Sequence, residues 1–240
     1  MRTLAALAAL AITAGCSIDI GDGDGIQGQG SGNQRTYRVG RFDSVELGGS
    51  SHVIVNVGGA PSVTATGESD TLDRLVIRID GSTLHIGRRS SLLDFSSGGP
   101  VTVHVTVPSL RAASLGGSGI IRIDRVEGSR FAAEIGGSGS IIVDRLTTDT
   151  ASLSIAGSGT IRAAGAVHHS EVEIAGSGDI DAGGLDSQTL RVEVAGSGTL
   201  RARATQTADV NVAGSGTVTI TGGAHCTVER HGSGQVNCGG

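Results

Sequence analysis

The chain has 240 residues, a formal net charge of −5 and 41 glycines, but only three phenylalanines, one tyrosine and no tryptophan. Its basic residues are all arginines, and they mix with acidic residues along the chain without forming a basic block. This pattern argues against nucleic-acid binding, which needs a concentrated cationic surface. The length suits one domain or two small ones.

Residues 1–15 are predicted to be a signal peptide that is removed on export. Arg2 supplies a positively charged start, and residues 4–12 supply an apolar stretch. This stretch is too short to span a bilayer, so it does not predict a membrane helix.

The letters "TAGC" at the end of this segment resemble a bacterial lipoprotein signal. The resemblance implies cleavage before Cys16 and attachment of lipid to that cysteine, although Thr13 stands where such signals usually have Leu, Val or Ile. Ordinary secretory cleavage near Gly15 is the alternative. Ser17 follows the cysteine, which by the same resemblance favours the outer membrane. Several acyl chains would make the attachment stable.

Residues 16–36 are predicted to form a flexible tether behind the lipid anchor. The segment is rich in glycine and acidic residues and has no periodic apolar pattern, so it cannot bury a core. Asp22 and Asp24 suggest calcium, but an EF-hand loop needs more ligands and a terminal glutamate. We therefore predict no metal site here.

Residues 37–110 are predicted to form longer, irregular β coils that cap one end of a repeat domain. Short alternating segments end at Gly, Pro, Asp or Ser, and "RIDGSTLHI" predicts a hairpin that turns at Asp80–Gly81. Residues 47–55, "LGGSSHVIV", look like a degenerate first corner of the repeats that follow. Such caps protect the end strands of a solenoid from pairing with other chains.

One segment of this cap, Gly87 to Pro100, interrupts the strands. It brings arginines and large apolar side chains together: Arg88, Arg89, Leu92, Leu93 and Phe95. Two interpretations stay open. The loop folds back as a lid on the core, or it forms a docking surface for an envelope component or a second copy of the chain.

Residues 111–240 contain a Gly-Ser-Gly triplet that recurs at steps of 20, 20, 19, 20, 18 and 18 residues. A fixed period in this range is typical of a solenoid. Glycine suits a tight corner because it reaches positive φ without steric cost. The first glycines of the triplets, and so the predicted corners, are Gly117, Gly137, Gly157, Gly176, Gly196, Gly214 and Gly232.

Apolar and polar residues alternate on both sides of each triplet, as in Ile121, Arg122 and Ile123. This alternation predicts half-buried strands before and after every corner. The sequence therefore predicts an all-β, single-stranded parallel β-solenoid with coils of 18–20 residues. The triplet serines, from Ser118 to Ser233, would form a ladder of hydroxyl groups that bond to one another and to the backbone, with a ligand-binding strip as the alternative.

Histidines and cysteines suggest metal sites that the spacing does not support. His168 and His169 are adjacent, so in a strand they would point to opposite faces, and we expect an exposed loop pair instead. Cys226 and Cys238 lie near the C-terminus without a standard zinc spacing. Both are expected to point into the core, and an oxidising compartment predicts a disulfide that closes the last coil.

The order of elements resembles the bacterial family described as putative auto-transporter adhesin, head GIN domain. The segments that carry the resemblance are "FDSVELGGSSHVIV", "LVIRIDGSTLHI" and "VTVHVTVPSLRAASLGGSG", followed by the serial Gly-Ser-Gly coils. It spans roughly residues 39–221. It implies a β-solenoid on secreted or lipid-anchored envelope proteins, and it brings no catalytic residues to carry over.

Three functions follow from these patterns. The first is a non-enzymatic, lipid-anchored envelope module that acts as an adhesin or structural protein towards an envelope protein or extracellular ligand. The second is a periplasmic scaffold or accessory subunit. The third is a glycan-acting enzyme, suggested by the stacked Asp124 and Asp144, but neither a cleft nor aromatic platforms accompany them. We expect no catalytic residue and no cofactor, and we treat residues 37–240 as one continuous domain.

Overall fold

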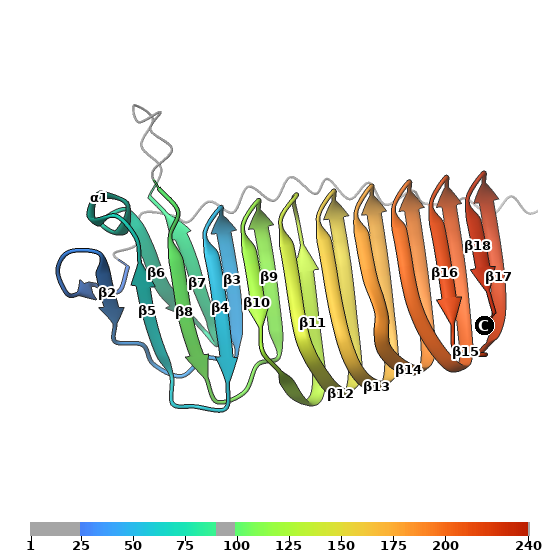
Figure 1. Ribbon diagram of the computed structural model, residues 1–240, viewed down its shortest axis with the longest axis horizontal. Helices are drawn as coiled ribbons and strands as arrows, with labels where there is room; N and C mark the ends of the chain where they lie inside the picture. The colour runs from blue at the N-terminus through green and yellow to red at the C-terminus, as the bar shows by residue number, and fades with distance from the viewer. Residues whose placement is uncertain (1–24, 90–98, 240) are drawn as a thin grey trace, which may run out of the picture.

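The computed structural model describes residues 25–89 and 99–239 as a rod of stacked β-strands (Figure 1). Cys16 and the proposed tether before residue 25 lie outside this part, as do Leu92, Leu93 and Phe95. No helix in the described part is long and apolar enough to cross a bilayer.

The regular coils begin at residue 112, and their strands pair in parallel with the equivalent strands of neighbouring coils. Some strands continue through the bend between the two faces and are therefore long. In chain order they are β9 (Ala112–Gly117), β10 (Ile120–Ile123), β11 (Val126–Ile135), β12 (Ser140–Gly157), β13 (Thr160–Gly176), β14 (Asp179–Gly196), β15 (Thr199–Gly214), β16 (Thr217–Thr221), β17 (His225–Gly232) and β18 (Gln235–Cys238).

The alternation in the sequence sets the register of these coils and places the aliphatic side chains in the core. Ile141 pairs with Ile161, and Ile161 pairs with Ile180, so like side chains stack along the rod. All three are buried, whereas Arg162 beside them points outward and is exposed. The predicted β-solenoid and its inward columns are therefore confirmed.

Close approach between coils explains why the corner glycine recurs. A Cβ added at Gly137 would lie 2.5 Å from the carbonyl oxygen of Gly117, and each later corner glycine meets its predecessor in the same way. Positive φ is found at five of the seven corners, from Gly157 onward, but not at Gly117 or Gly137. The lack of space for a Cβ atom between coils, rather than a positive φ, is thus the requirement for glycine that all seven corners share.

The triplet serines do not form the predicted ladder of hydrogen bonds. They are exposed along the corner, and in the part of the chain that the structure describes none of the seven triplet hydroxyls has a hydrogen-bond partner. Their backbone groups hold the corner instead. The N–H of Ser138, for example, donates to the oxygen of Gly117 at 3.0 Å.

The N-terminal part adds a coil whose place in the stack differs from its place in the chain. Strands β3 (Ser44–Gly49) and β4 (His52–Val57) form the degenerate corner predicted at residues 47–55. They pair in parallel with β9 and β10 on one side and with β7 (Thr83–Arg88) and β8 (Thr102–Val107) on the other. The chain therefore leaves this coil, builds the cap, and returns across it.

Antiparallel strands close the N-terminal end of the rod (Figure 1). On one face β5 (Ser62–Thr66) pairs with β8 and with β2 (Gln34–Tyr37), which pairs with β1 (Gly28–Gln29). On the other face β6 (Leu75–Asp80) and β7 form the predicted hairpin, and a short helix, α1 (Ser69–Leu72), precedes β6. The outer strands of the cap are thus antiparallel, while β7 and β8 continue the parallel stack, so the cap is irregular as predicted.

Tyr37 offers a direct probe of this cap, because it is the only tyrosine and the chain has no tryptophan. Burial raises the pKa of its phenol above the ordinary value of 10.0, while the charge of Arg35 opposes the rise. The folded state holds the proton more tightly than the unfolded chain. The protonated phenol therefore contributes to the free energy of unfolding. This contribution is fully present below about pH 10 and is lost as the pH rises through the folded-state pKa.

We expect phenolate absorbance to rise at higher pH in the native protein than in denaturant. The denatured chain serves as the control, because its tyrosine should titrate near the ordinary value. Identical titration curves in the two states would contradict burial of Tyr37 in the cap.

Candidate functional site

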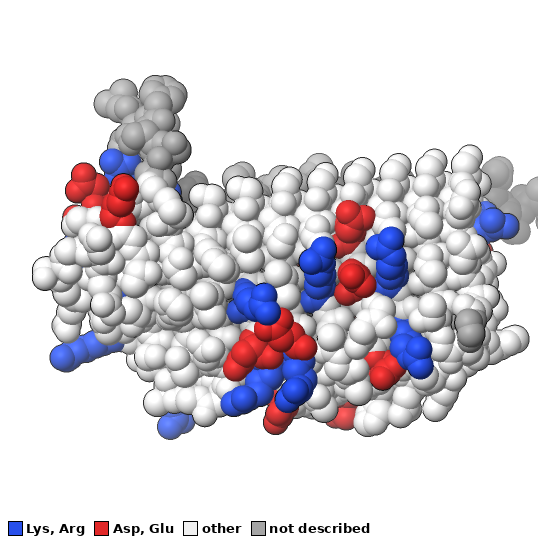
Figure 2. Space-filling view, viewed as in Figure 1, with Lys and Arg blue, Asp and Glu red and all other residues white. Residues whose placement is uncertain are grey.

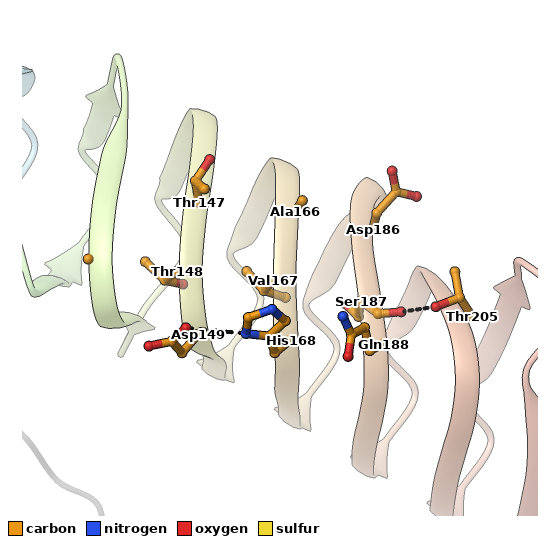
Figure 3. Close-up of a pocket in the computed structure, with 11 residues that line it drawn as sticks. Thr147, Thr148, Asp149, Ala166, Val167, His168, Asp186, Ser187, Gln188 and Thr205 are labelled. Carbon is orange, nitrogen blue, oxygen red and sulfur yellow. Dashed lines mark hydrogen bonds and ion pairs between the residues drawn. The ribbon is translucent and has the colours of Figure 1, made fainter.

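The long strands bend between the two faces of the rod, and this bend carries a depression of about 400 Å³ (Figure 3). Three consecutive residues from each of three coils form it: Thr147–Asp149 of β12, Ala166–His168 of β13 and Asp186–Gln188 of β14. We call these nine residues the trough. Gly128 and Thr205 lie at its ends.

The middle residue of each triplet is buried and forms the floor of the trough. Thr148 pairs with Val167, and Val167 pairs with Ser187, so the floor crosses three neighbouring strands. The Thr148 hydroxyl donates to the oxygen of Thr150 at 3.1 Å. The Ser187 hydroxyl bonds to that of Ser170 beneath it at 2.7 Å, so the buried polar groups of the floor are satisfied.

The outer residues of each triplet are exposed and form two walls that run along the rod. Thr147, Ala166 and Asp186 make one wall, and Figure 3 shows the small Ala166 between the other two. Asp149, His168 and Gln188 make the other wall. Every wall residue except Ala166 can donate or accept a hydrogen bond.

Each carboxylate of the trough has a basic partner. The Nδ1 atom of His168 lies 3.2 Å from Oδ1 of Asp149, a pair that carries full charge only when the imidazole is protonated. Asp186 is paired with Nε of Arg203 on β15. On the face shown in Figure 2, basic and acidic side chains also lie beside one another rather than in separate patches.

A second depression, of about 570 Å³, adjoins the trough and shares Asp149 with it. It is also polar, and its lining extends towards the N-terminal cap: Ser44, Arg111, Ser129, Arg130, Asp149 and Thr150. Arg111 forms an ion pair with Asp43. The bend therefore offers an elongated polar surface that crosses several coils.

Sequence reasoning missed the trough and misplaced its histidine. His168 and His169 were expected in an exposed loop, but both lie within β13, where His169 bonds to the Thr189 hydroxyl at 2.8 Å. Gly165 and a shift of register in β13 interrupt the repeat just before them, which hid the strand. In the described residues no three His, Cys, Asp or Glu side chains are grouped to hold a metal ion.

The structure places part of the predicted interaction loop. Arg88 ends β7 and donates from Nη2 to the oxygen of Gly99 at 3.1 Å, and the Arg89 N–H donates to the oxygen of Arg74 at 2.9 Å. These bonds tie both ends of the loop to the cap. Its apolar residues are outside the described part, so the choice between lid and docking surface stays a prediction.

The structure joins Cys226 and Cys238 in a disulfide across the last coil, with their Cα atoms 6.5 Å apart. Facing sheets normally lie about 10 Å apart, so the coil narrows here. Both cysteines occupy inward positions, as predicted, because Cys226 pairs with the buried Ala208 and Cys238 with the buried Ile220. They are less buried than those neighbours because they belong to the last coil of the described part. Cys226 is only partly buried and Cys238 is exposed.

We expect reduction of this disulfide to loosen the last coil without unfolding the rod. The two cysteines are 12 residues apart. A disulfide that closes a loop of that length raises the free energy of unfolding by about 3 kcal/mol. Hydrogen exchange should accelerate in β17 and β18 and stay unchanged in β12 and β13. A variant with both cysteines changed to serine should not respond to the reductant, and alkylation of two thiols before reduction would refute the bond.

Comparisons with known proteins agree with this fold. The family model described as "Putative auto-transporter adhesin, head GIN domain" matches residues 41–224. The crystal structure of a putative adhesin from Bacteroides fragilis is similar, with 20% identity, a TM-score of 0.79, and coverage of 89% of this chain and 99% of that one. None of the curated proteins matches the chain in sequence.

Two further crystal structures share the fold at low identity. A putative lipid binding protein from Parabacteroides distasonis has 24% identity and a TM-score of 0.69, with coverage of 88% of this chain and 97% of that one. A putative adhesin from Parabacteroides merdae has 20% identity and a TM-score of 0.69, with coverage of 90% and 99%. At these identities the likeness concerns the fold.

Proposed function

This chain belongs to the putative auto-transporter adhesin, head GIN domain family, and from that premise we propose that it is a non-enzymatic, lipid-anchored module of the bacterial envelope. Its role in this proposal is adhesive or structural contact with a ligand outside the membrane. Cys16 carries the lipid, and residues 17–24 connect it to the rod.

The placement of the first described residues carries the proposal. The N–H of Ile26 donates to the oxygen of Ile77 on β6 at 2.7 Å, so the chain enters the rod at its capped end. An anchor ten residues before Ile26 would hold that end near the membrane. The long sides and the C-terminal end of the rod would then be available for contact with a partner.

The contacts of Asp124 and Asp144 support a non-enzymatic role. Both oxygens of Asp144 accept from Arg122, at 2.9 and 3.1 Å. Oδ1 of Asp124 accepts from the backbone N–H groups of Val57 and Arg125, at 2.9 and 2.7 Å. These carboxylates stabilise neighbouring coils, which argues against the acid and base roles of a glycan-cleaving pair.

Two experiments test this function. Cys16→Ser should move the chain from the membrane fraction to the soluble fraction and abolish incorporation of labelled fatty acid. Protease treatment of intact cells should remove a C-terminal tag while a periplasmic control protein survives. If the tag is protected instead, contact outside the cell is excluded and a periplasmic accessory role replaces it.

A further inference from the structure

The trough has the dimensions and direction of a site for an extended chain. Its floor crosses β12, β13 and β14, so its long axis follows the rod rather than any one strand. Neighbouring strands lie about 4.8 Å apart, which separates the outer two of these strands by about 10 Å. Each coil therefore presents the same two wall positions to successive units of a ligand.

Unused hydrogen-bonding capacity is concentrated on the walls. In the described residues the side chains of Thr147 and Gln188 have no hydrogen-bond partner, and both are exposed. His168 uses Nδ1 for Asp149, which leaves Nε2 for a ligand. The walls thus offer hydroxyl, amide, imidazole and carboxylate groups within three consecutive coils.

The charge of the trough favours a neutral ligand. Asp186 is paired with Arg203, and Asp149 contacts His168, which carries a charge only when it is protonated. An anionic polymer therefore meets no unpaired cation among the trough residues, and a cationic polymer meets at most one carboxylate, Asp149, without a full counter-charge. A paired carboxylate still has free lone pairs that accept hydrogen bonds. A ligand that both donates and accepts while carrying no charge fits these groups best.

The lining lacks the large apolar anchors of a typical protein partner. Protein interfaces depend on buried aromatic or large aliphatic anchors, whereas the apolar groups here are Val167 in the floor and the methyl group of Ala166. We propose that the trough binds a neutral, hydroxyl-rich saccharide chain that lies along the rod. This inference rests on the proposed function, because it names the class of ligand that the adhesive contact would use.

The absence of aromatic residues from the trough predicts weak binding of each sugar ring. Saccharide sites commonly stack rings on aromatic side chains, but the trough contains none. Affinity must come from hydrogen bonds that recur on successive coils, and many rods on one cell would add avidity. We therefore expect polymers and oligomers to bind measurably better than single sugars.

The test uses the full chain, purified in detergent, on an array of linear neutral and acidic glycans. A neutral oligosaccharide from the array is then titrated by calorimetry. Ala166→Arg places a long side chain in the trough and should weaken binding by about tenfold or more. Ala175→Arg is the matched control, because Ala175 is exposed on the same strand but lies outside the trough.

A second variant separates the wall chemistry from simple obstruction. Gln188→Ala removes a free amide without adding volume and should also weaken binding, while both variants keep the unfolding midpoint of the native protein. The inference is overturned if no neutral glycan binds, if only acidic glycans bind, or if Ala166→Arg binds like Ala175→Arg.

Attachment of whole cells distinguishes this inference from the function on which it rests. Cells that display the chain should attach to the glycan surface, and cells with Ala166→Arg should not. If both attach equally well, the saccharide inference fails while the adhesive function stands. If cells without the chain attach as well as cells with it, the chain does not mediate attachment, and the proposed adhesive function fails together with the saccharide inference.

Discussion

Gly137→Ala is expected to lower the free energy of unfolding by about 3 kcal/mol. The new Cβ would lie 2.5 Å from the oxygen of Gly117, which belongs to the backbone of the neighbouring coil. That oxygen accepts hydrogen bonds from the N–H groups of Ser138 and Gly139, both at 3.0 Å. The clash therefore cannot be relieved without weakening the bonds that hold two coils together.

Gly136→Ala supplies the matched control, one residue away. A Cβ at Gly136 meets nothing within 4 Å, and later coils have alanine at the equivalent position, for example Ala156 and Ala175. We expect this change to alter stability by less than about 0.5 kcal/mol. Urea unfolding followed by circular dichroism measures both, and equal midpoints would contradict a steric role for the corner.

Gly196→Ala should lower the free energy of unfolding more than Gly137→Ala does. A Cβ there would lie 2.2 Å from the oxygen of Gly176, and Gly196 also has a φ of +133°. A residue with a side chain rarely adopts this conformation, which adds about 1–3 kcal/mol of backbone strain. A larger loss for Gly196→Ala than for Gly137→Ala would separate strain from contact between coils.

The repeats could be predicted from the sequence because the same physical requirement recurs in every coil. Period-two alternation identified the inward positions, and the triplet spacing aligned Ile161 with Ile180 despite a step of 19 residues. The position of β3 and β4 between β7–β8 and β9–β10 could not be predicted. Alternation says which face of a strand is buried, but it does not say which strand lies beside it.

The trough was hidden for a related reason. It lies in the bend, where coils differ in length and registers shift. Counting back from Gly157, Gly176 and Gly196 does align Thr148, Val167 and Ser187, but this column mixes polar and apolar residues and so does not stand out as buried. The one available signal was the polar residue at an inward position, such as the buried Ser170. Its partner Ser187 is visible only once the coils are stacked.

Phe131→Ala is expected to destabilise the rod by about 3–5 kcal/mol. Phe131 is fully buried and is one of the largest side chains in the core. Its neighbour in the next coil is Ala151, followed by Ser170, so small side chains surround the space that the ring occupies. Neighbouring coils are held in register by their backbone hydrogen bonds, which limits how far they can collapse into a cavity.

Glu134→Ala on the same strand, β11, is the control for Phe131→Ala. Glu134 is exposed, and its removal should change stability by less than about 0.5 kcal/mol. Unfolding midpoints in urea measure both variants. If Phe131→Ala lost no more than Glu134→Ala, the coils would have to close around the vacated space. The stack of coils could then not be rigid. In that case, the fixed spacing between coils at the corner glycines would no longer explain why every coil repeats the same residues.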